Sequence, residues 1–111
     1  MDPQQSALNL SKSVRNQLDA FSVRVKQIAP DAKIIVFGSQ AAGTATKQSD
    51  IDVCIVSDRW SQDYHSGTVT LLSIAHEFSL PMDVIPYSPE DLDNKYDPLA
   101  KEVRNKGIHI S

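Results

Sequence analysis

The chain has little cysteine, no long hydrophobic run and no excess of basic charge. Its single cysteine, Cys54, excludes an internal disulfide, and its position in an apolar run predicts a buried thiol. No stretch is long enough for a transmembrane helix, and the first residues lack the basic-then-apolar pattern of a signal peptide. A formal net charge of -3 excludes a broad basic surface for nucleic acid. We therefore expect a cytoplasmic protein that binds neither membranes nor nucleic acid in bulk.

What remains is the composition of an ordinary globular protein. With 111 residues, 41% hydrophobic and 23% charged, the chain is expected to form a single domain over residues 1–111. Patterning predicts helices at 6–28, 68–79, from 89 and at 98–106, and strands at 33–37, 50–56, 81–85 and 108–110, with a polar loop at 57–67. Pro86 is expected to close the third strand. The elements predict an α/β (α+β) fold, a small mixed sheet with helices packed mainly on one face.

The most informative segment joins the first two expected strands. An apolar run ends in Gly38-Ser39, and after a polar loop Asp50 and Asp52 alternate with apolar residues. Because side chains two apart in a strand point to one face, the two carboxylates should lie side by side. Their repulsion is removed by a divalent cation, and Mg²⁺ is bound through carboxylates together with substrate phosphates. The segment predicts a site for one or two magnesium ions beside a turn that can approach phosphates.

A third carboxylate, Asp83, interrupts the apolar run of the third expected strand. Aspartate is rare in strands, and an unpaired buried carboxylate is costly. If this strand lies beside 50–56, Asp83 joins Asp50 and Asp52 around the metal, where it can also act on an attacking hydroxyl. Each feature alone has an ordinary explanation, such as a turn, an exposed edge strand or a partner lysine. Their combination in this order is far more specific.

The order Gly38-Ser39, then Asp50-Ile51-Asp52, resembles the nucleotidyltransferase signature of the DNA polymerase beta superfamily. The loop between the two motifs looks most like that of the minimal nucleotidyltransferases of prokaryotes. Members of that group are often encoded beside a helical HEPN protein as a toxin–antitoxin pair. The resemblance implies a nucleotidyltransferase fold for this chain.

The resemblance also implies a role for each motif residue. The phosphates of ATP or another nucleoside triphosphate would be bound by Gly38, Ser39 and Ser49, whereas Mg²⁺ binding and catalysis would fall to Asp50, Asp52 and Asp83. The implied reaction moves a nucleoside monophosphate, most often AMP from ATP, to a hydroxyl and releases pyrophosphate. In the antitoxin branch the acceptor is a tyrosine of the HEPN toxin, which is thereby silenced. A protein partner of this kind, or self-association through the first helix, is expected.

The chain departs from this pattern in the loop, where family members commonly carry arginine. Gln40 and Ala42 stand there instead, and Lys47 is the loop's one cation. Without the bidentate clamp that arginine provides, a second reading stays open, in which the fold silences a partner by contact without chemistry. A third reading is transfer to a small-molecule hydroxyl, such as that of an antibiotic, although such enzymes generally use an additional acceptor domain.

Overall fold

A four-stranded mixed sheet organises the part of the chain that the computed structural model describes, residues 12–38, 50–61 and 63–111. The strands are β1 (Lys33–Phe37), β2 (Ile51–Val56), β3 (Met82–Tyr87) and β4 (Ile108–His109). Their order is β3-β2-β1-β4, in which β1 pairs antiparallel with β2 and β4, and β2 pairs parallel with β3. The helices are α2 (Lys12–Ile28), the 3₁₀ helix η1 (Asp58–Ser61), α4 (Tyr64–Ala75), α5 (Pro89–Asp93) and α6 (Pro98–Lys106).

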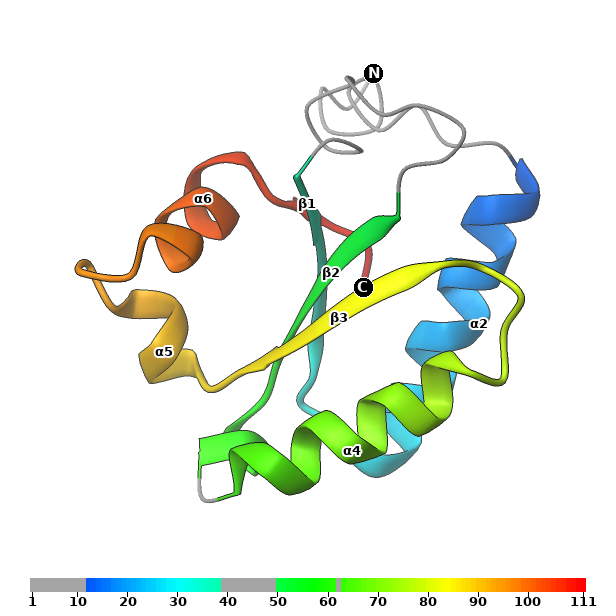
Figure 1. Cartoon of the computed structure of the whole chain (residues 1–111), viewed down its shortest axis with the longest axis horizontal. Coiled ribbons are helices and arrows are strands. Elements are labelled where there is room, and N and C mark those ends of the chain that lie inside the picture. Colours follow the sequence, from blue (N-terminus) through cyan, green and yellow to red (C-terminus); the bar gives the residue numbers. More distant parts are fainter. Residues whose placement is uncertain (1–11, 39–49, 62) are drawn as a thin grey trace.

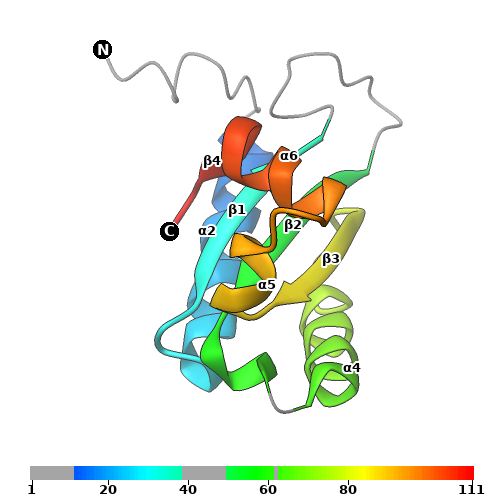
Figure 2. The same ribbon diagram turned by 90° about the vertical axis from the view of Figure 1, so that its left-hand side faces the viewer.

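The two long helices cover one face of the sheet and the two short ones cover the other (Figures 1 and 2). On the first face, α2 and α4 supply a core with the strand residues Ile34, Val36, Val53, Ile55 and Val84. On the second, α5 and α6 pack over the strand residues Ile35, Phe37, Cys54, Val56 and Tyr87. The strands are buried on both faces, so they read as continuous apolar runs rather than alternating ones. The expected α/β class is confirmed: the larger helical layer lies on one face, and α5 and α6 add a smaller one.

Several local expectations are confirmed by the described residues. The first strand has the expected bounds, and the helix at 98–106 ends before Gly107 as predicted. Cys54 is fully buried, and its burial raises the pKa of the thiol to about 12. Of the expected first helix, residues 6–11 lie outside the described part of the chain. No helix in the described ranges is long and apolar enough to cross a membrane.

Three expectations were wrong. The helix expected at 68–79 ends at Ala75, and residues 76–79 form turns and bends. Pro86 does not end the third strand, because β3 is an edge strand that continues to Tyr87 and a proline there needs no partner for its missing N–H. The polar segment 57–67 is not a loop throughout. It contains η1 and the first turn of α4, which begins early because the Asp63 carboxylate accepts the Ser66 N–H as an N-cap.

The start of α4 depends on the close packing of Gly67 against Trp60. Trp60 is buried and donates its indole N–H to the Ile55 carbonyl at 3.1 Å. A Cβ added at Gly67 would lie 2.7 Å from Cε3 of that ring. We expect Gly67→Ala to destabilise the fold by about 1–2 kcal/mol, because overpacking outweighs the gain in helix propensity. Urea unfolding measures this, and Ser66→Ala, on the exposed side of the same turn, should not reproduce it.

Candidate functional site

The three predicted acids lie at one end of the sheet, where β2 and β3 begin. Asp52 and Asp83 are direct partners in the parallel β2–β3 pair, so their side chains leave the same face of the sheet. Cys54 and Val56 show that this is the α5–α6 face. Asp50 precedes β2 by one residue and has the same parity as Asp52. The strand register thus brings together acids that lie more than thirty positions apart in the sequence.

Gly38 is the residue that lets the end of β1 approach Asp52. It follows Phe37, the antiparallel partner of Asp52, and has a φ of +72°, in the left-handed region that favours glycine. A Cβ at this position would lie 2.3 Å from Oδ2 of Asp52. Two separate constraints, one on backbone conformation and one on space, therefore require glycine here. The bare backbone also leaves room for a ligand oxygen next to the carboxylate.

The carboxyl group of Asp52 sits in an environment that disfavours its charge. Partial burial raises its pKa most, and the negative charges of Asp83, Asp50 and Glu102 raise it further. Of the described charges, those acting on this carboxyl are all negative. An acid in such a setting gains stability when a cation binds beside it.

Glu102 is the site residue that sequence reasoning missed. It lies on α6, half-buried and next to the buried Val103. The helical period of 98–106 places it at the margin of the buried face, which is the only signal that the sequence carries. Which strand end that margin meets depends on how α6 returns across the sheet, and this cannot be deduced from the pattern of a single helix.

The position of α6 is fixed by hydrogen bonds at both of its ends. The Asp97 carboxylate caps the helix by accepting the Leu99 N–H at 3.0 Å and also accepts the Tyr87 hydroxyl at 2.7 Å. Near the other end, Arg104 donates to the Leu92 carbonyl. These contacts tie α6 to β3 and α5, and so hold the outer face of α6 in a set place relative to the acids.

The carboxylates suit a hard divalent cation by their chemistry. Within the described residues no three Asp, Glu, His or Cys side chains already converge as a set of metal ligands. The donors present are oxygen atoms from neighbouring strands about 4.8 Å apart, and their mutual repulsion at Asp52 is relieved by a cation. Asp50, Asp52 and Asp83 are the residues that would hold the metal.

The predicted phosphate-binding residues are described only in part. Gly38 is placed beside Asp52, as the motif implied. Ser39 and Ser49, like Gln40, Ala42 and Lys47, lie outside the described residues.

Comparison with known proteins gives a family. The chain is 43% identical over 60 residues to the terminal uridylyltransferase cid1 of Schizosaccharomyces pombe; that stretch is 54% of this chain and 14% of the yeast protein, so the chain spans about a seventh of that relative. A family model described as a nucleotidyltransferase domain matches residues 18–108. The match includes Gly38 and all three acids, and it supports the resemblance to the DNA polymerase beta superfamily. The chain belongs to the nucleotidyltransferase domain family.

Proposed function

We propose that this chain transfers a nucleoside monophosphate from a nucleoside triphosphate to an acceptor hydroxyl in a magnesium-dependent reaction. The observation that carries the proposal is the pairing of Asp52 with Asp83 across β2 and β3, with the Gly38 backbone against the Asp52 carboxylate. Membership of the nucleotidyltransferase domain family supports the reaction class. In the reaction the acceptor oxygen bonds to the α-phosphorus, the bond from that phosphorus to the bridging oxygen breaks, and pyrophosphate leaves.

Each motif residue has a task in this step. Asp50 and Asp52 would hold the metal, and Asp83 accepts the proton of the attacking hydroxyl. Gly38 lets the backbone approach the phosphates, with Ser39 and Ser49 as further phosphate ligands. A bound Mg²⁺ supplies charge neutralisation on the phosphates and lowers the pKa of the acceptor hydroxyl.

As the specific reaction, we propose transfer of AMP from ATP to a tyrosine of a HEPN-type toxin, with this chain as the cytoplasmic antitoxin. The support is the resemblance of the glycine–serine and Asp-Ile-Asp motifs to those of the minimal nucleotidyltransferases. The name of the yeast relative raises UTP as the other donor to test. Gln40 and Ala42, at positions where arginine is common, favour a second candidate function: neutralisation of the partner by contact alone.

The deciding experiment is label transfer in native lysate with Mg²⁺, using ATP and UTP labelled at either the α- or the γ-phosphate. We expect α-label on an acceptor protein, no γ-label, and loss of the signal in Asp50→Asn. The matched control is Asp93→Asn, an exposed acid at the end of α5, beyond the opposite end of β3. The contact-only function replaces the catalytic one if no triphosphate gives label and the Asp50→Asn variant still co-purifies with a partner and silences it.

A further inference from the structure

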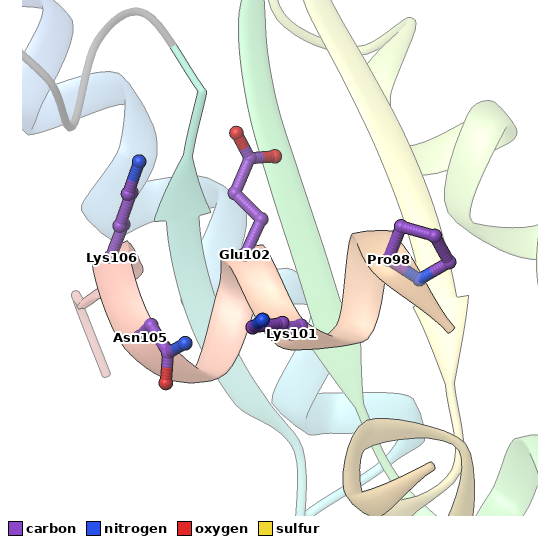
Figure 3. A pocket seen from close by; sticks show the side chains of 5 residues that line it. All are labelled: Pro98, Lys101, Glu102, Asn105 and Lys106. Atoms are coloured by element: carbon purple, nitrogen blue, oxygen red, sulfur yellow. The ribbon is translucent and has the colours of Figure 1, made fainter. Parts of the chain in front are cut away.

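The outer face of α6 carries a surface hollow beside the acidic end of the sheet. Its lining consists of Pro98, Lys101, Glu102, Asn105 and Lys106, and its volume is about 230 Å³ (Figure 3). Pockets that enclose a whole small ligand usually measure about 300–1,000 Å³. This hollow is therefore sized for part of a nucleotide rather than for all of it.

The hollow adjoins the candidate site through Glu102. Val103, the neighbour of Glu102 on α6, packs in the same buried cluster as Phe37, which is the strand partner of Asp52. In Figure 3 the side chains of Glu102 and Lys106 extend in the same direction, toward the end of β1 where Gly38 follows.

Lys101 and Lys106 are cations without a competing partner in the described part of the chain. Glu102 and Lys106 have the spacing of a helical ion pair, yet the ion pairs among the described residues are Arg15–Asp19 and Arg24–Glu77. The described arginines are all engaged: Arg15 and Arg24 in these pairs, and Arg59 and Arg104 with backbone carbonyls. A basic residue in the last turn also favours the helix dipole, but that role explains Lys106 alone and not the hollow.

The donor of a nucleotidyl transfer brings several negative charges to a site that already holds four carboxylates. Metal ions offset part of this charge, and protein cations must offset the rest where the β- and γ-phosphates lie. Among the described residues on the α5–α6 side, Lys101 and Lys106 line the same hollow as Glu102. Their positive charge can compensate for the lack of arginine in the loop after Gly38.

We propose that Lys101 and Lys106 bind the β- and γ-phosphates of the nucleoside triphosphate in the hollow on α6, an assignment that rests on the proposed nucleotidyl transfer. The hollow then receives the part of the donor that leaves as pyrophosphate. The α-phosphate lies toward Asp50, Asp52 and Asp83.

The test is calorimetric titration of the purified protein with three probes in Mg²⁺ buffer: ATP, inorganic tripolyphosphate and AMP. Lys101→Gln and Lys106→Gln should each weaken ATP and tripolyphosphate binding by about tenfold, the effect of losing one charge-assisted contact. AMP binding should not change, because AMP lacks the two outer phosphates. Lys106→Arg should retain binding. The matched control is Lys33→Gln, an exposed lysine that begins β1, at the opposite end of that strand from Gly38.

The outcomes separate this assignment from the proposed reaction. Equal tripolyphosphate affinity in wild type and the Lys101→Gln/Lys106→Gln double variant, or no tripolyphosphate binding by wild type, would overturn the phosphate assignment even if label transfer occurs. Tripolyphosphate binding that depends on the lysines would uphold the assignment. If it occurs without label transfer in lysate, the proposed reaction is contradicted.

Discussion

Asp52→Asn is expected to abolish nucleotidyl transfer while it raises the thermal stability of the metal-free protein. Loss of a carboxylate that we propose as a metal ligand should remove several kcal/mol of transition-state stabilisation, which corresponds to about 10³-fold or more in rate. The stability gain follows from the surroundings of this half-buried carboxyl, which lies near Asp83, Asp50 and Glu102. An amide of the same shape carries no charge, so the repulsion disappears.

The same residue predicts a pH dependence with a definite sign. The pKa of Asp52 is higher in the folded protein than its ordinary value of 3.8. In the window between these two values the folded state binds more protons than the unfolded state. The contribution of Asp52 to stability is therefore fully present below the ordinary pKa and is lost as pH rises through the folded pKa. Asp31, Glu77 and Asp97 have lowered pKa values and act in the opposite direction, so the difference between wild type and Asp52→Asn isolates the effect.

Differential scanning fluorimetry from pH 3 to pH 8, with and without Mg²⁺, measures this difference alongside the label-transfer assay. Wild type should gain stability when Mg²⁺ is added at neutral pH, because the ion binds the folded state, and Asp52→Asn should gain much less. Asp93→Asn should behave as wild type in both assays. An Asp52→Asn protein that is less stable than wild type at neutral pH would contradict the electrostatic account, and one that retains transfer would contradict the catalytic role.

The parts of this fold that sequence reasoning predicted are those governed by local rules. The apolar runs on either side of the loop define β1 and β2, and the two-residue period puts Asp50 and Asp52 on one face. The sequence predicted that Asp83 joins Asp52 only if their two strands are neighbours. It could not show that they are, because the register of β2 and β3 depends on the crossover through α4.

Features that arise from tertiary packing could not be predicted from the sequence pattern. Pro86 was read as a strand end because proline cannot donate to a ladder, but that rule is relaxed on an edge, and edge position is a property of the whole sheet. Glu102 and Lys106 read as ordinary helix-surface charges until α6 is seen beside the end of β1. In this chain the sequence predicted Asp50, Asp52 and Asp83 as metal ligands, and the fold was needed to find what surrounds them.

Gly38→Ala is expected to disable the site and to destabilise the fold together. A left-handed φ of +72° costs an alanine about 1–2 kcal/mol, and the added methyl group meets Oδ2 of Asp52 at 2.3 Å. Because that carboxylate must turn away to make room, its oxygens leave the position proposed for metal binding. Transfer should fall by about 10²-fold or more, the usual effect of displacing a reacting group by an ångström.

A stability-matched variant and a double-mutant cycle distinguish the site effect from general unfolding. Gly67→Ala also creates a close contact, at 2.7 Å from Cε3 of Trp60 at the start of α4, away from the acids and from α6. At a temperature where both variants are folded, Gly67→Ala should keep transfer and Gly38→Ala should not. In an Asp52→Ala background the steric contact is absent, so the destabilisation caused by Gly38→Ala should shrink to the backbone contribution alone. Simple additivity of the two substitutions would show that Gly38 acts through its backbone conformation and not through contact with Asp52.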